Sequence, residues 1–208
     1  MGNKKRNIVV LFFVCFVILC FPTVAKSGST HCFGKCGVVD TGQTTVEVSG
    51  DDASYNPQGT QMSYTVSADS TTVTDNRTSL MWKRCSQGQD VDPSYGCTST
   101  TTATQITWVN AITSCKDDRT AGYIDWRLPN VKELFTLVEF HAYGTTAPLG
   151  APYINQTVFP NTVSNYYWTG TTYVPSTDVA MLVGFQYGPV DVILKTGSGY
   201  VRCVRGGP

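Results

Sequence analysis

Apolar and polar residues divide the chain into regions with different patterns. An uninterrupted apolar run extends from Ile8 to Phe21. Residues 26–72 are instead rich in Thr, Ser, Gly and Gln, and two short stretches there, Thr44–Ser49 and Met62–Ser67, alternate as strands do. We therefore predict an N-terminal extension over residues 26–72 that packs on a main domain over residues 73–208.

The main domain begins with a predicted hairpin. Thr72–Thr74 and Leu80–Trp82 are prone to form strands, and they flank Asp75-Asn-Arg-Thr78, a sequence typical of a turn. The hairpin would place two short antiparallel strands at the start of the domain.

Two helices are predicted after this hairpin. In the first, apolar residues recur at offsets of three, four and seven from Trp108, so Cys115 should point inward, and Thr107 can act as the N-cap. The second begins at a capping box, in which Asn130 accepts from first-turn amides and Glu133 reaches back. Its predicted buried stripe comprises Val131, Leu134, Phe135 and Val138.

The last part of the chain predicts a long loop followed by strands. Residues 143–165 contain Pro and Gly without periodicity, and loops of this length are usually functional or pinned by packing. A hairpin, two helices and an antiparallel meander together predict an α+β fold, with two helices packed on antiparallel strands. The four strands predicted after the loop are Tyr166–Val174, Val179–Tyr187, Val190–Lys195 and Tyr200–Arg205.

The N-terminal region has the three parts of a bacterial signal peptide. Basic residues at positions 4–6 precede the apolar run, and Pro22-Thr-Val-Ala25 supplies small residues before a cleavage site, which predicts a signal peptide over residues 1–25. The alternative is a retained membrane anchor, but the apolar run is shorter than the about 20 residues that a transmembrane helix needs. We expect an exported protein that is secreted, held at the cell surface or kept in the periplasm.

The charge balance argues against a general affinity for polyanions. The whole chain has 15 basic and 15 acidic residues. Removal of Lys4, Lys5 and Arg6 with the signal peptide leaves 12 basic against 15 acidic residues, a net charge of −3. No net positive field then remains to attract nucleic acid or sulfated polysaccharides, so no nucleic-acid partner is expected.

Six cysteines remain after the signal peptide, and they point to disulfides. An even number in an exported chain favours a disulfide framework, although six cysteines allow 15 pairings. Cys32 with Cys36 and Cys85 with Cys97 could close short loops, and Cys115 with Cys203 could join the early part of the domain to its last strand. The alternative for the Cys-x3-Cys pair is a zinc site, but an oxidising compartment favours disulfides, so we predict no metal and no cofactor.

Several motifs occur in a fixed order along the main domain, and together they resemble a known family. Preceded by Thr41-Gly-Gln-Thr44, they resemble the bacterial Lcl C-terminal domain family over roughly residues 40–207. The Arg-Leu-Pro helix start and the closing Val-Arg-Gly-Gly are also similar to the formylglycine-generating-enzyme group. The motifs are Val73-Thr-Asp-Asn-Arg-Thr-Ser-Leu-Met-Trp82, Thr107-Trp108 with Ala111 and Cys115, Asp125-Trp-Arg-Leu-Pro-Asn-Val-Lys-Glu-Leu134, Tyr167-Trp-Thr169 and Tyr200-Val-Arg-Cys-Val-Arg-Gly-Gly207.

The resemblance implies both a fold and a kind of partner. The fold would be C-type-lectin-like, in which a disulfide joins the first helix to the last strand, and this supports pairing Cys115 with Cys203. Family members are cell-surface or secreted proteins, and the namesake is linked to trimer formation and glycosaminoglycan binding, so a homo-oligomer is implied. The calcium-dependent sugar motifs Glu-Pro-Asn and Gln-Pro-Asp are absent from the sequence, so calcium-mediated sugar binding is not supported.

Tryptophans and arginines inside these motifs have a structural and a functional interpretation. Arg127 and Arg202 are expected to be structural, held by buried carbonyls or carboxylates. Because all four tryptophans lie in motifs that define the fold, core packing is favoured over sugar stacking for Trp82, Trp108, Trp126 and Trp168.

The sequence carries little that catalysis would need. The two histidines, His31 and His141, lie in no catalytic motif. Asp118 falls in the turn after the first helix, and Cys203 stands alone near the chain end, where the formylglycine enzymes need a reactive pair. We predict that the chain is not an enzyme. The alternative is a secreted hydrolase or oxidase that uses Asp118, His141 or Cys203.

The function predicted from these features is binding outside the cytoplasm. We expect a secreted or cell-surface binding module, adhesin-like, that recognises a carbohydrate or protein ligand; the alternative is a structural or oligomerising subunit of a surface assembly. Its ligand face is expected on the long loop and the outward side of the meander, because Tyr and Asn give adaptable contacts. The residues predicted to contact the ligand are Tyr153, Asn155, Tyr173, Asp178, Gln186, Tyr187, Asp191 and Lys195.

Overall fold

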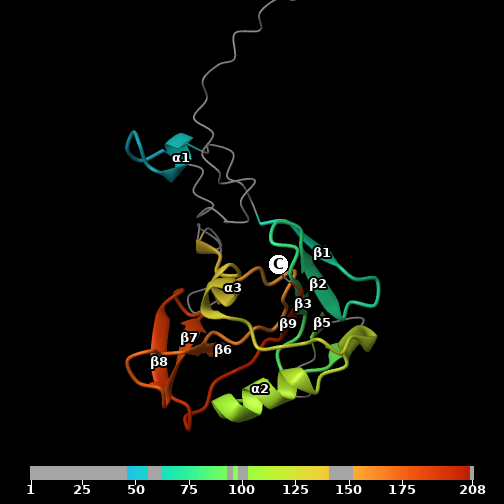
Figure 1. Cartoon of the computed structure of the whole chain (residues 1–208). Coiled ribbons are helices and arrows are strands. Elements are labelled where there is room, and N and C mark those ends of the chain that lie inside the picture. The colour runs from blue at the N-terminus through green and yellow to red at the C-terminus, as the bar shows by residue number, and fades with distance from the viewer. Residues whose placement is uncertain (1–45, 56–61, 93–95, 98–102, 141–151, 207–208) are drawn as a thin grey trace, which may run out of the picture. The chain divides into compact units, whose positions relative to one another are not determined.

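A computed structural model of the chain describes residues 46–55, 62–92, 96–97, 103–140 and 152–206 (Figure 1). The predicted signal peptide over residues 1–25, the pair Cys32 and Cys36, and both histidines lie outside these ranges. Within the described ranges, no helix is both long enough and apolar enough to cross a membrane.

The hairpin predicted at the start of the domain lies at the centre of an antiparallel sheet. Its turn forms because the Asp75 carboxylate accepts from the Arg77 amide at 2.9 Å and from Thr78 Oγ1 at 2.6 Å. The hairpin prediction is confirmed, and a strand is also present within Met62–Ser67. The strands, in spatial order, are β1 (Tyr64–Val66), β2 (Thr72–Asp75), β3 (Met81–Lys83) and β9 (Val204–Arg205).

The other strand predicted in the extension, Thr44–Ser49, is wrong in its described part. Residues 46–51 form a turn that leads into a short helix, α1 (Asp52–Tyr55). The Asp51 carboxylate accounts for this turn, because it accepts from the amides of Glu47 and Val48 at 2.8 and 3.2 Å. A side chain that bonds to nearby amides competes with strand pairing.

Both predicted helices are present. They are α2 (Trp108–Lys116) and α3 (Val131–Phe135), with a short 3-10 turn, η2 (Thr120–Gly122), between them. The capping box of α3 is complete: the Glu133 amide donates to Asn130 Oδ1 at 2.9 Å, and the Asn130 amide donates to Glu133 Oε2 at 2.8 Å. Thr107 is the N-cap residue of α2, but its side chain makes no capping hydrogen bond, so this detail of the prediction is wrong. The Trp108 amide donates instead to the Lys195 carbonyl at 3.1 Å.

The buried stripe predicted for α3 is wrong at one position. Leu134 and Val138 are buried as expected, but Phe135 is 38 % exposed, and Leu137 is completely buried in its place. The reason is that the α-helix ends at Phe135 and the next turn is tighter. The Leu137 amide donates to the Leu134 carbonyl, three residues back rather than four, and this step turns Leu137 inward.

The predicted meander forms a second antiparallel sheet of three strands. They are β6 (Tyr166–Thr172), β7 (Val179–Gly184) and β8 (Val190–Leu194), in that spatial order. β8 pairs with β7 on one side and is therefore an edge strand of this sheet. A further small hairpin joins β4 (Val91–Asp92) to β5 (Gly96–Cys97).

The fourth strand, predicted at Tyr200–Arg205, is confirmed only at Val204–Arg205, and its predicted place in the meander is wrong. This segment crosses from one sheet to the other and pairs with different partners on the way. At its start the Trp168 amide donates to the Tyr200 carbonyl at 2.8 Å, while at its end Val204 pairs with Trp82 in the first sheet. A continuous pairing with β8 is excluded because the backbone groups of this segment are already engaged.

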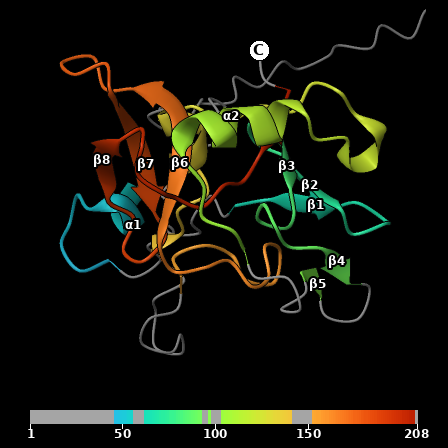
Figure 2. The same cartoon turned by 90° about the horizontal axis from the view of Figure 1, so that it is seen from below.

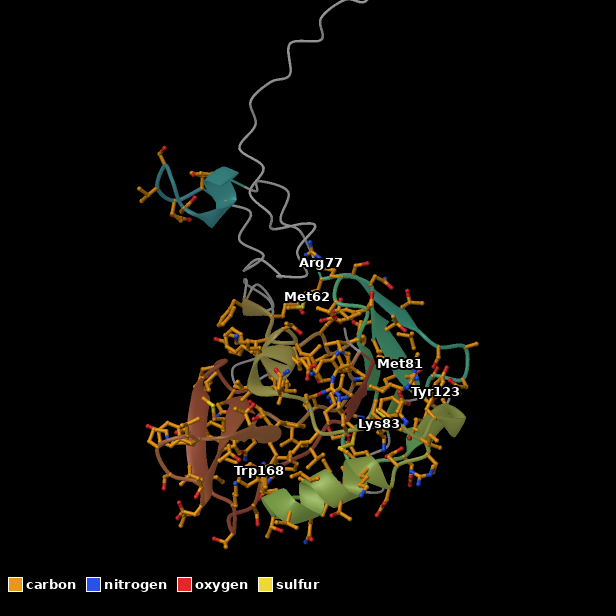
Figure 3. All side chains as sticks on the ribbon, in the orientation of Figure 1. Met62, Arg77, Met81, Lys83, Tyr123 and Trp168 are labelled. Atoms are coloured by element: carbon orange, nitrogen blue, oxygen red, sulfur yellow. A yellow bond between two sulfur atoms is a disulfide. The ribbon has the colours of Figure 1, made fainter. Side chains whose placement is uncertain are left out.

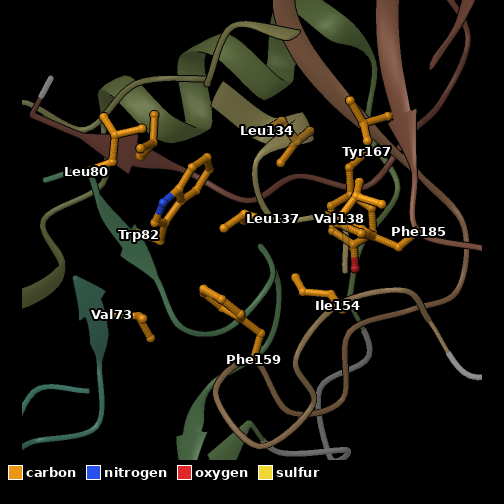
Figure 4. Packing of buried hydrophobic residues seen from close by; sticks show 12 residues of the cluster. Val73, Leu80, Trp82, Leu134, Leu137, Val138, Ile154, Phe159, Tyr167 and Phe185 are labelled. Carbon is orange, nitrogen blue, oxygen red and sulfur yellow. The ribbon is translucent and has the colours of Figure 1, made fainter. Parts of the chain in front are cut away.

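Two clusters of buried side chains form the interior. The larger one joins the first sheet, α3 and the meander, and includes Trp82, Leu134 and Tyr167 (Figure 4). The second one lies where α2 packs against β6, and it includes Cys115, Trp168 and Leu182 (Figure 2). In the described part of the long loop, Ile154 and Phe159 are also in the larger cluster, so this part is pinned by packing.

The tryptophans and arginines have the structural roles predicted for them. Trp82, Trp126 and Trp168 are buried, and Trp108 packs partly buried against the second cluster. Arg127 forms a bidentate ion pair with Glu133, with N–O distances of 2.7 and 2.8 Å.

Arg202 is a completely buried cation. Its Nη1 donates to the carbonyl oxygens of Lys83 and Arg84, and its Nη2 donates to Ser86 Oγ at 3.2 Å and to Thr162 Oγ1 at 2.8 Å. Burial lowers the pKa of its guanidinium to about 10, which leaves the group charged at neutral pH. Arg202 therefore joins β3, the segment after it and the long loop through one side chain.

Two of the predicted disulfides lie in the described residues, and both pairings are confirmed. Cys85 is bonded to Cys97, with a Cα–Cα distance of 5.3 Å, and Cys115 is bonded to Cys203, with a Cα–Cα distance of 5.5 Å. The second bridge fastens α2 to the segment that enters β9. Disulfides persist in oxidising compartments, so both bridges are consistent with an extracytoplasmic location.

Candidate functional site

The eight residues predicted to contact a ligand lie in separate places. Tyr153 and Tyr187 are neighbours, whereas Tyr173, Asp178 and Lys195 lie at the opposite end of the meander, where the Lys195 amide donates to the Asp178 carbonyl. Asn155 stabilises its own turn by accepting from the amides of residues 157 and 158. The predicted face is therefore not one continuous surface.

Gln186 and Asp191 lie beside a partly buried tyrosine, Tyr166. The pKa of Tyr166 is raised, first by burial and then by its hydrogen bond to Asp191, while Gln186 acts in the opposite direction. Tyr166 packs against the second core cluster. These two predicted residues therefore support a strand of the meander.

Lys195 and Asp178 are also engaged within the fold. The Lys195 ammonium lies 4.1 Å from the centre of the Trp108 ring and donates to Thr172 Oγ1 at 3.0 Å and to the Thr177 carbonyl at 2.7 Å. A hydrogen bond from Ser176 is the main reason that the pKa of Asp178 is lowered. This group of side chains fastens the ends of β6 and β8 to α2.

The strongest candidate for a contact surface is a row of four aromatic rings, which we call the aromatic row: Phe135, Phe140, Tyr153 and Tyr187. Neighbouring ring centres are 6.2, 6.4 and 6.1 Å apart along the row, and the rings meet at steep angles. Three of them are well exposed: Phe135 by 38 %, Phe140 by 42 % and Tyr187 by 68 %. Aromatic side chains in contact with water at this density are unusual on a monomer, and such patches mark interaction surfaces.

Three segments of the chain position the aromatic row. The capping box fixes the start of α3 and so places Phe135, while backbone hydrogen bonds hold Tyr153 between the Phe185 carbonyl and the Glu139 amide. Gly188, with φ of +76°, closes the turn beneath Phe140. A Cβ there would lie 2.9 Å from Phe140 Cε1 and 2.8 Å from Val138 Cγ1, so the close approach of the ring requires glycine.

β8 extends this surface with an exposed apolar edge. Val190, Val192 and Leu194 are exposed, and they pair with Val183, Met181 and Val179 of β7. Val183 belongs to the core cluster that includes α3, so the three β8 side chains lie on the same face of the sheet as α3. The aromatic row and this stripe meet at the turn 185–189, which connects β7 to β8.

Asp118, the acidic residue considered for catalysis, is held in an ion pair. Asp118 accepts from Lys83 Nζ at 2.6 Å and from Thr120 Oγ1, and these bonds outweigh the effect of burial, so that the pKa of Asp118 is lowered. Cys203 is in a disulfide. In the part of the chain that the structure describes, no group of three or more His, Cys, Asp or Glu side chains could hold a metal ion.

Comparison with known proteins gives the family. A model of the Lcl C-terminal domain matches residues 71–205, which cover the hairpin, both helices, the meander and β9. The chain belongs to the Lcl C-terminal domain family. The matched range includes all four rings of the aromatic row and both described disulfides of this Lcl C-terminal domain. No curated protein matches the chain significantly.

Two members of the aromatic row were missed in the sequence. The apolar pattern predicts Phe135 in the buried stripe of α3 of the Lcl C-terminal domain, and Phe140 lies beyond the periodic pattern. The apolar repeat continues from Phe135 to Val138, so the sequence gives no sign that the α-helix ends at Phe135. The neighbours of Phe140 come from segments that are distant in the sequence, so no local pattern could reveal them.

Proposed function

We propose that this chain is an exported, adhesin-like binding module that takes a protein ligand on the aromatic row. The observation that carries the proposal is the unbroken contact of four rings, each 6.1 to 6.4 Å from the next. Centres of protein interfaces are enriched in aromatic residues and depleted in charged ones, and a few such anchors supply most of the binding energy.

A protein ligand is favoured over a carbohydrate at this surface. Two of the four rings are phenylalanines, which offer no hydroxyl to a sugar, and the surface continues into the valines of β8. An edge strand also offers backbone groups to a second polypeptide, and in β8 the Val192 amide would have to exchange its 2.8 Å hydrogen bond to Asp191 Oδ1 for one to the ligand. A ligand segment lying along Val190–Leu194 could therefore combine backbone pairing with contacts to the rings.

Export and a C-type-lectin-like fold are part of the same proposal. The two disulfides and the N-terminal sequence pattern support export. The bridge between α2 and the segment entering the last strand supports the lectin-like fold, since it is the connection that this fold implies.

Two substitutions test the proposal. Tyr187→Ser and Phe140→Ser remove exposed rings, and Val109→Ser, at an apolar position of α2 that is 61 % exposed, is the matched control. Binding of the purified protein to extracellular matrix and to intact cells is measured before and after treatment of those surfaces with protease or with periodate, which destroys glycans. We expect protease to abolish binding and each ring substitution to weaken it by at least roughly 30-fold, the effect of a typical hot spot.

Three outcomes would overturn the proposal. The first is a loss of binding after periodate but not after protease, which identifies a carbohydrate ligand. The second is equal binding of the control and the two ring variants. The third is binding that occurs between copies of this chain alone, detected by light scattering and lost in the ring variants.

A further inference from the structure

A hollow of about 370 Å³ lies on the solvent face of the first sheet, formed by different residues from those of the aromatic row. Its walls come from β1, β2, β3 and the connection that carries Ala121 and Tyr123. Small-molecule sites have volumes of about 300 to 1,000 Å³, so this hollow has the size for a ligand of one or two rings.

The register of the sheet gives the hollow a polar floor. Thr65 of β1 pairs with Thr74 of β2, which pairs with Met81 of β3. Cross-strand partners share a face, and the neighbouring positions Val73 and Trp82 point into the core, so these three side chains face the hollow. Hydroxyl groups both donate and accept hydrogen bonds, which suits a ligand that carries many hydroxyls of its own. The Thr65 hydroxyl donates to Asn76 Oδ1 at 3.0 Å and can still accept from a ligand.

Asp69 gives the hollow a fixed carboxylate at the turn between β1 and β2. It accepts from Ser67 Oγ at 2.6 Å, from Thr71 Oγ1 at 2.9 Å and from the Thr71 amide at 3.2 Å. These hydrogen bonds, with that from Ser67 the largest, lower the pKa of Asp69, so the group is ionised at neutral pH. An ionised carboxylate has about four acceptor positions, and one remains for a hydroxyl of a ligand.

Tyr123 forms an aromatic wall beside Met81 and the sheet, as the labelled side chains show (Figure 3). The Arg205 guanidinium lies 3.7 Å from the centre of its ring, and Arg205 is itself held by Asp125 through bonds of 2.7 and 3.1 Å. The Trp126 ring also packs against Tyr123 in a T-shaped pair, with the ring centres 6.5 Å apart. The ring is 37 % exposed, so it is held in place before any ligand arrives and still offers apolar surface to one.

The charges around the hollow exclude an anionic ligand. Arg205 is neutralised by Asp125, and Lys83, which follows in the next row of the sheet, is paired with Asp118 at 2.6 Å. The remaining charge that lines the hollow is the carboxylate of Asp69, which repels uronates and sulfates.

We infer that this hollow is a binding site for a neutral saccharide of one or two units, with Thr65, Thr74 and Asp69 bonding its hydroxyls and Tyr123 packing on its apolar face. The inference is independent of the proposed function, since the aromatic row contributes no residue to the hollow. It gives the same domain a second binding site, for a saccharide instead of a protein.

The test is an NMR titration of the purified protein with methyl α-mannoside, methyl β-galactoside and N-acetylglucosamine, with glucuronate as the anionic comparison. We expect at least one neutral sugar to shift amides in residues 65–74 and 121–123, with a Kd in the millimolar range, on the order of −4 kcal/mol. Glucuronate should bind at least roughly tenfold more weakly, because of the like charge of Asp69.

Matched variants separate the hollow from other surfaces. Thr74→Val keeps the size of the side chain and removes its hydroxyl, and Asp69→Asn removes the charge; each should weaken binding about tenfold, the effect of one lost hydrogen bond to a polar group. Two control variants should leave the affinity for the sugar unchanged. They are Tyr187→Ser and Thr113→Val, the latter in a different hydroxyl-lined hollow of about 350 Å³ on α2.

Several results would overturn the inference. The first is the absence of shifts with any neutral sugar at roughly 50 mM, well above a millimolar Kd, and the second is shifts confined to other residues. The third is an affinity for glucuronate equal to that for the neutral sugars. The fourth is sugar binding by the Thr74→Val and Asp69→Asn variants equal to that of wild type. Sugar binding that survives in Tyr187→Ser while matrix binding is lost would support both proposals separately.

Discussion

Removing the Cys115–Cys203 disulfide should destabilise the domain more than removing the Cys85–Cys97 disulfide. The two bridges close loops of 88 and 12 residues. A cross-link restricts the unfolded chain by an amount that grows with the logarithm of loop length, and this gives about 4.6 kcal/mol for the long loop and about 2.8 kcal/mol for the short one. The expected difference between the two bridges is therefore about 1.8 kcal/mol.

The difference in stability loss between the two double variants reports the effect of loop length, because the surroundings of the two bridges are similar. All four sulfur-bearing side chains are buried, with exposed fractions of 2 % or less, so replacing either pair by alanine leaves a comparable cavity. The Cys115→Ala/Cys203→Ala variant should lower the melting temperature by about 10 to 18 °C, since 1 kcal/mol corresponds to about 2–4 °C in a domain of this size.

Equilibrium unfolding in urea measures the prediction directly. Wild type and the two double variants are compared at equal protein concentration, and peptide mass mapping confirms the remaining bridge in each. The reasoning is refuted if the two double variants are equally destabilised, or if the order is reversed. It also fails if Cys115 and Cys203 are free thiols in the native protein.

Three further substitutions test individual contacts. Arg202→Lys keeps the charge but loses the planar fork that reaches four oxygens, so it should cost about 3 kcal/mol or more in urea unfolding, and a change below about 1 kcal/mol would contradict this. Asn130→Ala removes the cap of α3 and should cost about 1 kcal/mol in the same assay; no measurable loss would be evidence against the capping box. The pKa of Asp118 is lowered below its ordinary value of 3.8, so its stabilisation is present above about pH 4 and is lost as the pH falls through the lower folded pKa. Melting curves from pH 2 to 7 should therefore show a smaller acid loss for Asp118→Asn than for wild type, and parallel curves would exclude this role.

The features predicted well from the sequence are those encoded by neighbouring residues. The capping box depends on Asn130 and Glu133, which are three positions apart, and the hairpin depends on an aspartate within its own turn. The inward direction of Cys115 follows from helical spacing, whereas its pairing with Cys203 was supported by the family resemblance.

The features that could not be predicted depend on partners far away in the sequence. Val204 pairs with Trp82, which is more than a hundred residues earlier, and nothing near Tyr200 reveals that its strand leaves the meander. The aromatic row joins three segments, and its exposed Phe135 imitates a core residue because it continues the apolar repeat of α3. Of the eight predicted ligand residues, Tyr153 and Tyr187 meet in this row, because tertiary packing rather than residue type decides which side chains share a surface.

The closing residues of the chain determine when the domain can finish folding. Arg202, Cys203 and β9 are consecutive, and they supply the buried guanidinium, one half of the long bridge and the last strand of the first sheet. In a chain synthesised from its amino end, Cys85 and Cys97 can form their disulfide before Cys203, the partner of Cys115, is present, because Cys203 follows Cys115 by 88 residues. A premature stop shortly before position 202 would therefore leave Cys115 as a free thiol and the first sheet without its last strand.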